Sequence, residues 1–533
     1  MKTFLGNWRD YCFRVAPRVA VAALMSICAQ ATAAGVASAA RDSDIDSVRK
    51  HLATGADVNE PEADGTSALL WAAYQSSPDL TKLLLEAGAN PNAANAFGVT
   101  SLLQASRYGD VATLRALLAG GADIASAVRD DETPLMAAAR AGSVEAVKLL
   151  IEHGADPNAV DSAENQTPLM WAAAEGHLDV VDALLDVGAD VNRKARVSEL
   201  TKRSMRTDFP AGGFTALMWA ARNGNEAMVR RLVEGGADLG LTNGDGATAM
   251  MLTIVNDRFD LAATLLELGA NANDGALYYA VEMRDATTDL RAKDGSRLRA
   301  DHQNRLTALD LVRVLLDAGA DPNKPYTGQM HSATMCCDVQ GEGTPFFRAA
   351  VAADVDALRL MIAHGADVEW KAEPVEGAMR MPFADHTGLS PLMAAVNGGQ
   401  GVLMAGGPGD IREGKPPPFR EIANRNPADA VRVLLEAGAN PDIVNAQGSS
   451  ALHIAAHDGR LEVIRALVEG NASLDLRNAD GLTPLQVVER MPTRAQDPLA
   501  EMLGLLDDGA QPRETVAFFR ELIAERAKTQ HGR

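Results

Sequence analysis

The chain has 533 residues and a formal charge of −21, because 71 acidic side chains outnumber 50 basic ones. Proteins that bind nucleic acids present a basic face, and docking on anionic lipid uses basic segments, so this balance argues against both kinds of partner. Two explanations fit the acidity: it keeps the protein soluble, or it attracts a cationic partner. Solubility is the simpler explanation.

The first 33 residues have the pattern of a secretory signal peptide. Four basic residues precede an apolar run over 19–29, and small residues in Ala-x-Ala steps follow. The run is too short for a comfortable membrane span. We expect cleavage around Ala31 to Ala34, export to the periplasm or beyond, and no membrane attachment afterwards; an uncleaved anchor is the alternative. Cleavage after residue 33 removes four basic groups and one acidic group, which leaves a mature charge of −24.

A Gly-Ala pair followed by Asp or Asn recurs along the rest of the chain at a near-constant interval. Gly55, Gly88, Gly121 and Gly154 are spaced 33 residues apart. Mostly longer intervals separate the later members of the series, which are Gly188, Gly236, Gly269, Gly319, Gly365, Gly438, Asn471 and Gly509. A fixed period with tolerated insertions is typical of a stacked repeat array and not of a closed globular domain. We therefore predict a repeat array over residues 34–512.

Each unit has the pattern of two helices. In the unit ETPLMAAARAGSVEAVKLLIEHGADPNAVD, Thr133 is placed to cap a first helix, and Pro134 suits its first position. Apolar residues recur near helical spacing over 144–151, which predicts a second helix with one apolar face. Gly154 follows where a helix end favours positive φ, and Asn471 takes this place in a later unit. One short helix pair cannot bury its apolar face alone, so neighbouring units must cover it.

These units resemble the ankyrin repeat family, whose motif runs T-P-L-H-x-A-A, then Gly, a second helix and Gly-Ala-Asp. The matching segments are TPLMAAA, TPLMWAA, TALMWAA, SPLMAAV and SALHIAA, and the resemblance covers about twelve units. It implies an all-α solenoid of helix-turn-helix units with short hairpin connections. The histidine of the family motif is mostly replaced by Leu or Met and survives as His453, so an apolar side chain takes the place of a hydrogen-bonding imidazole.

Five insertions interrupt the period, near 197–212, 285–306, 324–343, 369–387 and 400–427. The first, third and fourth fall in hairpin connections, the side where ankyrin arrays usually meet partners, and the other two fall in turns between paired helices. Long loops in a compact fold are usually functional or disordered, and we expect the three hairpin-side loops to be functional. Residues 513–533 are predicted to form a capping helix and tail, with Val516, Phe519, Leu522 and Ile523 facing inward.

The third insertion contains His331 and the adjacent thiols Cys336 and Cys337. A disulfide between them is one reading, although consecutive α-carbons lie about 3.8 Å apart, so the bond would be strained. A metal site is a second reading, but zinc sites favour cysteines separated by two or more residues. An inert loop is the third. We keep the disulfide as a candidate and predict neither a metal nor a cofactor.

The candidate partner-binding residues lie where the first helix of each unit ends, just after the Ala-Ala pair. In ankyrin proteins, side chains at this place line the concave face. Arg and Tyr combine contact area with directed hydrogen bonds, and both are enriched at binding hot spots. The candidates are Arg41, Tyr74, Arg107, Tyr108, Arg140, Glu175, Arg222, Asn223 and His457.

Motifs of metalloproteases, serine hydrolases, zinc sites and EF-hands are absent from the sequence, so we do not expect an enzyme. The main hypothesis is a monomeric, exported, non-catalytic scaffold that binds a partner protein through its concave face and hairpin-side loops. One alternative is a redox- or metal-linked periplasmic accessory factor that uses Cys336 and Cys337. Another is a secreted effector directed at a host.

Overall fold

The computed structural model describes residues 35–125, 131–199, 210–244, 246–284, 304–326, 343–372, 388–396, 425–490 and 510–531. It divides into two compact units, unit 1 up to Ser162 and unit 2 from Ala163 onward. The predicted signal peptide, the two adjacent cysteines and most of the four later insertions lie outside the described residues.

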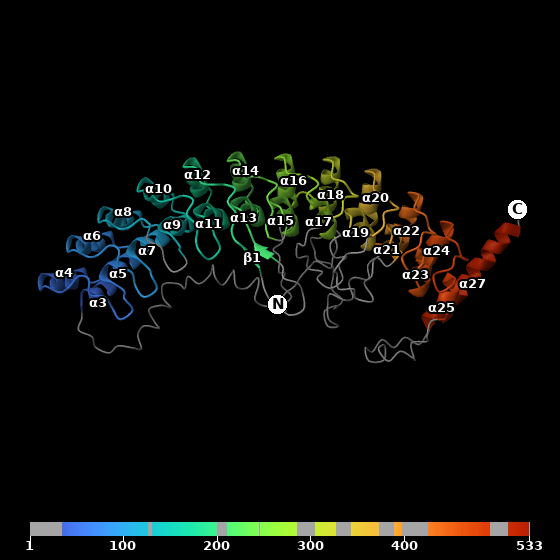
Figure 1. The fold of residues 1–533 in the computed structure, drawn as a ribbon, viewed down its shortest axis with the longest axis horizontal. Coiled ribbons are helices and arrows are strands. Elements are labelled where there is room, and N and C mark those ends of the chain that lie inside the picture. The colour runs from blue at the N-terminus through green and yellow to red at the C-terminus, as the bar shows by residue number, and fades with distance from the viewer. Residues whose placement is uncertain are drawn as a thin grey trace. The chain divides into compact units, whose positions relative to one another are not determined.

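Unit 1 consists of four helix pairs, and each helix is short. Within every pair a tight turn joins the first helix to the second, and the pairs stack in chain order (Figure 1). The helices are α3 (Val36–Arg41), α4 (Ile45–Ala53), α5 (Ala68–Tyr74), α6 (Pro78–Glu86), α7 (Ser101–Tyr108), α8 (Val111–Ala119), α9 (Pro134–Ala141) and α10 (Val144–Glu152).

Unit 2 continues the same arrangement, with seven helix pairs and two further helices among its described residues. Its elements are α11 (Pro168–Glu175), α12 (Leu178–Asp186), β1 (Val197–Glu199), β2 (Pro210–Gly212), α13 (Ala216–Asn223), α14 (Glu226–Glu234), α15 (Ala249–Val255), α16 (Phe259–Glu267), α17 (Ala276–Glu282), α18 (Ala308–Asp317), α19 (Pro345–Val351), α20 (Val355–Ala363), α21 (Pro391–Val396), α22 (Pro427–Glu436), α23 (Ala451–His457), α24 (Leu461–Glu469), α25 (Pro484–Arg490) and α27 (Ala510–His531). The predicted all-α repeat fold is confirmed, and β1–β2 is an addition that the sequence did not indicate.

Local sequence explains where the helices begin and end. The hydroxyl of Thr133 accepts a hydrogen bond from the backbone N–H of Met136, and Pro134 occupies the first turn of α9, as predicted. Gly154 after α10 has φ 94°, and Asn471 after α24 has φ 65°. The predicted caps are therefore confirmed at both ends of the helix pair.

The core runs between neighbouring repeats. In each unit, first helices pack on first helices and second helices on second helices, for example α5 on α7 and α6 on α8 (Figure 1). The replaced histidine position is central to this core, because Leu70, Leu103 and Met136 are at most 1% exposed there. Leu70 and Leu103 form one cluster with Val99 and Ala137. Each fully buried large apolar side chain of this kind contributes about 1.5–3 kcal/mol.

Asparagine side chains tie three connections of unit 2 to the repeats that follow them. The amide of Asn192 donates to the carbonyl oxygen of Gly236 at 3.0 Å and accepts from the backbone N–H of Asp238 at 2.8 Å. Asn273 and Asn323 make the same two bonds with the repeats that follow them. Gly240 takes the corresponding place in the repeat between those of Asn192 and Asn273, and it has no side chain to make these bonds.

Gly240→Asn is therefore expected to stabilise unit 2 by about 1 kcal/mol, because it adds two hydrogen bonds between repeats and removes backbone freedom from the unfolded chain. Gly240 does not have a positive φ, so the backbone accepts asparagine. Urea denaturation of the two proteins measures the change. An unchanged midpoint, with Asn192→Ala lowering it, would show that position 240 does not share the geometry of position 192.

The described ends of three insertions are paired. Strands β1 and β2 form an antiparallel ribbon at the first insertion, with Ser198 opposite Ala211. At the base of the third, the backbone N–H of Tyr326 donates to Gly343, and at the base of the fourth, that of Gly388 donates to Ala372. At each of these three insertions, the two chain ends that join the insertion to the array are therefore hydrogen-bonded to each other.

The C-terminal helix α27 packs on α25 through a narrow stripe. Thr515, Phe519 and Leu522 are buried, with at most 7% exposure. The prediction that Ile523 faces inward is wrong, because its side chain is 41% exposed. The buried residues Thr515, Phe519 and Leu522 are four and three positions apart along the helix, and Ile523 lies outside this stripe.

Candidate functional site

Tyr74 and Tyr108 end α5 and α7 in unit 1 and leave aromatic surface in solvent, with exposed fractions of 36% and 47%. The ring of Tyr74 lies 5.6 Å from that of Trp71. Burial raises the pKa of Tyr74, and the positive charge of Arg107 opposes the rise. Because α5 packs on α7, the two exposed tyrosines belong to one surface.

The three predicted arginines of unit 1 are held by glutamates from the connections. Arg41 lies 2.7 Å from Glu62, and Arg107 lies 2.5 Å from Glu132. Arg140 approaches the other oxygen of Glu132 at 3.5 Å. Exposed pairs of this kind contribute at most about 1 kcal/mol each, so their main effect is to fix the orientation of the guanidinium groups. The surface therefore alternates in charge and is not a positive stripe.

Glu62 and Glu132 were missed by the reasoning from sequence. Glu62 also accepts a hydrogen bond from the indole of Trp71, at 3.2 Å, so it joins the arginine row to the aromatic residues. Their place in the sequence could have indicated them, because both glutamates lie in the connection that precedes a first helix. Each pairs with the arginine of the preceding repeat, and Glu132 also approaches that of its own repeat. We name Arg41, Glu62, Trp71, Tyr74, Arg107, Tyr108, Glu132 and Arg140 the unit-1 face.

Two of the unit-2 candidates, Arg222 and Asn223, contact other residues of the array. The amide of Asn223 donates to the carbonyl oxygen of Ala174 at 2.7 Å, beside the end of α11, where Glu175 is exposed. The guanidinium of Arg222 lies 5.5 Å from the ring centre of Trp219, and burial lowers the pKa of Arg222. These residues lie near one another on α11 and α13, whereas His457 ends the distant helix α23.

His457 and the buried His453 stand on the same helix in opposite environments. An imidazole nitrogen of His457 lies 2.9 Å from the carboxylate of Asp458, whereas His453 lies 2.8 Å from the hydroxyl of Ser450 and 3.0 Å from the carbonyl of Leu482. The Asp458 contact raises the pKa of His457, and burial lowers that of His453.

The two imidazoles are therefore expected to titrate on opposite sides of pH 6.5. His453 binds a proton more readily in the unfolded chain, so the stability that it contributes is present above pH 6.5 and is lost as the pH falls toward its lowered native pKa. Imidazole NMR resonances measure both pKa values. His453→Leu is expected to remove this acid sensitivity, and equal pKa values for the two residues would contradict the assignment.

A pocket in unit 2 arises from a shortened connection. Helix α17 begins seven residues after Gly269, whereas α15 begins thirteen residues after Gly236. The shortened segment 270–275 leaves space between the neighbouring connections. A cavity of about 330 Å³ lies there, lined by Gly246, Ala272, Asn273, Asp274, Gly275, Leu277, Tyr278, Asp321, Lys324, Pro325, Tyr326 and Pro345.

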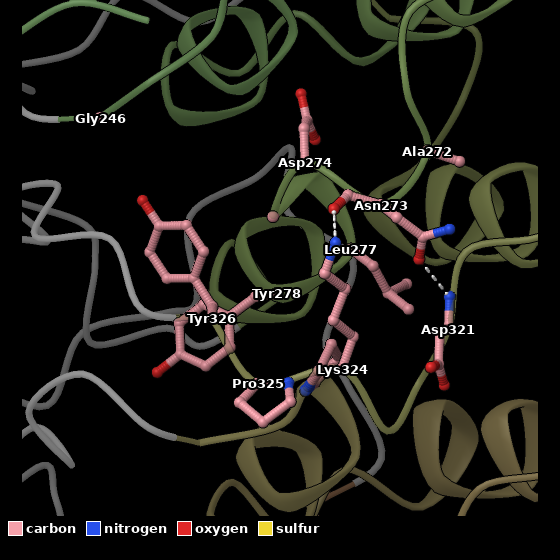
Figure 2. Close-up of a pocket in the computed structure, with 12 residues that line it drawn as sticks. Gly246, Ala272, Asn273, Asp274, Leu277, Tyr278, Asp321, Lys324, Pro325 and Tyr326 are labelled. Atoms are coloured by element: carbon pink, nitrogen blue, oxygen red, sulfur yellow. Dashed lines mark hydrogen bonds between the residues drawn. The ribbon is translucent and has the colours of Figure 1, made fainter. Parts of the chain in front are cut away.

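One side of this pocket is aromatic and the other is polar (Figure 2). The rings of Tyr278 and Tyr326 stack with centres 5.5 Å apart, and Tyr279 meets Tyr326 edge-on at 5.1 Å. Between the tyrosines and the polar side, the ammonium of Lys324 donates to the carbonyl oxygen of Asn273 at 2.8 Å. The aromatic residues thus form a rigid wall.

Asp274 is a partly buried carboxylate at this pocket. The hydroxyl of Thr248 donates to one of its oxygens at 2.5 Å, and the backbone N–H of Ala276 donates to the other at 2.8 Å. Burial raises the pKa of Asp274, and these hydrogen bonds together with the charge of Lys324 oppose the rise. No residue in the described ranges forms an ion pair with it.

The family model described as ankyrin repeats (3 copies) matches residues 36–128, 102–195, 197–287 and 420–496, which together exceed half of the chain. The chain belongs to the ankyrin repeat family. Among solved structures, the human ASB11 ankyrin repeat domain is similar at 24% identity, over 44% of this chain and 98% of that chain, with a TM-score of 0.38. No curated protein matches the chain.

Several predictions for this ankyrin array concern residues that the structure does not describe. Cys336 and Cys337 lie among them, so the disulfide stays a prediction. Within the described ranges, no group of three or more His, Cys, Asp or Glu is placed to hold a metal ion. The described helices include none that is both long and apolar enough to cross a membrane. The ankyrin match consists of repeats and brings no catalytic domain.

Proposed function

We propose that the protein is an exported, non-catalytic scaffold that binds a partner protein through the unit-1 face. Ankyrin repeats are associated with protein–protein interaction, which supports the general role. The observation that carries the proposal is the exposed pair Tyr74 and Tyr108, set among arginines that are already held by Glu62 and Glu132. Tyrosine and arginine side chains dominate the binding energy of protein interfaces.

The neighbouring connection adds apolar surface to the same unit. Phe97 is 65% exposed at the tip of the turn that precedes α7, where Ala94 bridges to Thr100. Side chains with few rotatable bonds lose little entropy when a partner binds, and ion-paired arginines have already lost part of theirs. The unit-1 face therefore suits a folded or extended protein surface that carries both apolar and charged groups.

Site-specific photo-crosslinking tests the binding surface. A photoreactive phenylalanine at position 74 or 108 is expected to capture a discrete partner from the producing cells, whereas the same group at Lys82, exposed on α6, is expected not to. The Tyr74→Ala/Tyr108→Ala variant should weaken binding of the captured partner at least thirtyfold, since each hot-spot residue contributes about 2 kcal/mol or more. Equal capture at all three positions, or unchanged affinity, rejects the unit-1 face.

Mass spectrometry of the mature chain tests export separately. We expect a new N-terminus close to Ala34 and recovery from the periplasm or the medium, with the medium favouring a secreted effector. An intact Met1 in protein from the cytoplasm rejects export and leaves the binding proposal standing.

A further inference from the structure

The pocket at the shortened connection has a composition that selects a ligand. We propose that it binds a positively charged side chain, arginine above all, presented by a peptide segment of a partner protein. This inference goes beyond the proposed function, because the pocket lies in unit 2 and shares no residue with the unit-1 face.

The shape of the pocket comes from the chain itself. Segment 270–275 reaches α17 without the hairpin that fills this place in the preceding repeat, so the two flanking connections and the start of α17 border an open space. The remaining cavity, about 330 Å³, holds one long side chain with its flanking backbone. A single side chain is therefore a better fit than a folded element.

The charges favour a cation. Asp274 and Asp321 line the pocket together with Lys324, so the lining residues carry one negative charge in excess. One oxygen of Asp321 accepts from the backbone N–H of Asn323 at 2.8 Å, so Asp274 is the carboxylate considered for the ligand. The Lys324 ammonium binds the carbonyl oxygen of Asn273 at 2.8 Å. Among the described residues it makes no ion pair with Asp274, so the carboxylate keeps lone pairs for another donor. A ligand cation fills that role.

The aromatic wall favours arginine over lysine. Tyr278 and Tyr326 line the cavity with their rings (Figure 2). The edge-on contact of Tyr279, behind this wall, fixes the orientation of Tyr326. A guanidinium group stacks flat on such a ring and directs its N–H groups sideways to a carboxylate. A lysine ammonium is more strongly hydrated and has no plane to stack, so it gains less from the same wall.

The hydrogen bonds of Asp274 within the described residues do not require its charge, although the nearby charge of Lys324 favours the ionised form. An asparagine at 274 would keep both contacts, because its oxygen can accept from the N–H of Ala276 and its amide can donate to the hydroxyl of Thr248. It would also avoid the cost of burying a charge, which is the main cause of the raised pKa of Asp274. A partly buried carboxylate whose charge is opposed by burial, and which lines a pocket where a cation can bind, is typical of a functional site.

A titration with small probes tests the pocket on the full mature chain. Nα-acetyl-arginine N-methylamide is expected to bind with millimolar affinity and to shift the ring resonances of Tyr278 and Tyr326 in NMR spectra. The citrulline analogue, which has the same shape without the charge, should bind at least tenfold more weakly. The lysine analogue is expected to lie between them.

Three variants separate the contributions. Asp274→Asn is expected to weaken arginine binding about tenfold, as befits the loss of one charged hydrogen bond, with no loss of stability at pH 7. Lys324→Met should strengthen binding several-fold, because it removes the competing positive charge. Glu267→Gln, on the exposed side of α16, removes one charge from the same unit and should leave binding unchanged.

The proposal fails if citrulline binds as well as arginine, if Lys324→Met weakens binding, or if inorganic phosphate binds more tightly than the arginine probe, which would indicate an anion site at Lys324. The citrulline and Lys324→Met results decide the matter even if Asp274→Asn does not fold. None of these outcomes depends on crosslinking at Tyr74 or Tyr108, so the proposal for the pocket and the proposal for the unit-1 face are tested independently.

Discussion

Asp354→Asn is expected to destabilise unit 2 by about 3–5 kcal/mol, because it removes the buried carboxylate that pairs with the buried arginine Arg284. The guanidinium of Arg284 donates two hydrogen bonds to the Asp354 carboxylate, of 2.5 and 2.9 Å. The two side chains are only 2% and 1% exposed. Asparagine has nearly the same shape and keeps an oxygen to cap α20, so the variant preserves the cap. It removes the charge and puts an N–H donor in place of the oxygen that accepts from Nε of Arg284.

The neighbours of this pair increase the expected effect. Arg348 forms a second buried ion pair, with Glu282, and the side chain of Arg425 donates to the backbone carbonyl of Arg284. The Asp354 carboxylate therefore lies among several guanidinium groups, and charges inside the protein are weakly screened, so the loss of its negative charge is expected to be felt by more than Arg284 alone.

Asp356 provides the matched control. Its carboxylate lies 4.0 Å from the same guanidinium but is 40% exposed, so Asp356→Asn should cost less than about 0.5 kcal/mol. Urea denaturation gives the overall change, and hydrogen exchange of α19 and α20 locates it, since a repeat array can open locally. If the two variants lose stability equally, the buried network does not hold these repeats together.

The periodic parts of the fold were predictable because each depends on residues close in sequence. Thr133, Pro134 and Gly154 set helix ends through contacts within four positions, so the 33-residue period was enough to place them. The exposed Tyr74 and Tyr108 followed from the same register. The sequence predicted too wide a buried face for the C-terminal helix α27, because Ile523 is exposed.

The rest could not be predicted because it depends on partners far along the chain. Glu282 and Arg348 are 66 residues apart, and nothing in either local sequence indicates that they meet inside the core. Glu62 and Glu132 lie in irregular connections, where the period gives no register. The shortened segment 270–275 lies between Gly269 and Gly319, where the insertion near 285–306 lengthens the Gly-Ala interval to 50 residues, so the shortening showed only in the missing T-P-L that should follow Gly269.

Gly275→Ala is expected to destabilise unit 2 by about 2–3 kcal/mol and to close the pocket. Gly275 precedes α17 with φ 113°, a conformation that alanine adopts only under strain. A β-carbon there would also lie 2.5 Å from two ring atoms of Tyr326. That ring is stacked on Tyr278 and held by Tyr279, so it cannot move aside without losing both contacts.

Gly269→Ala separates backbone strain from the clash with the ring. Gly269 belongs to the same repeat and has φ 101°, but a β-carbon added to it meets nothing within 4 Å. It should therefore cost only about 1 kcal/mol. The difference between the two alanine variants should shrink in a Tyr326→Leu background, where a flexible side chain can yield, and a double-mutant cycle measures this coupling. If Gly275→Ala costs the same with Tyr326 as with Leu at 326, the tyrosine does not pack against Gly275, and the aromatic wall of the pocket is not built as described.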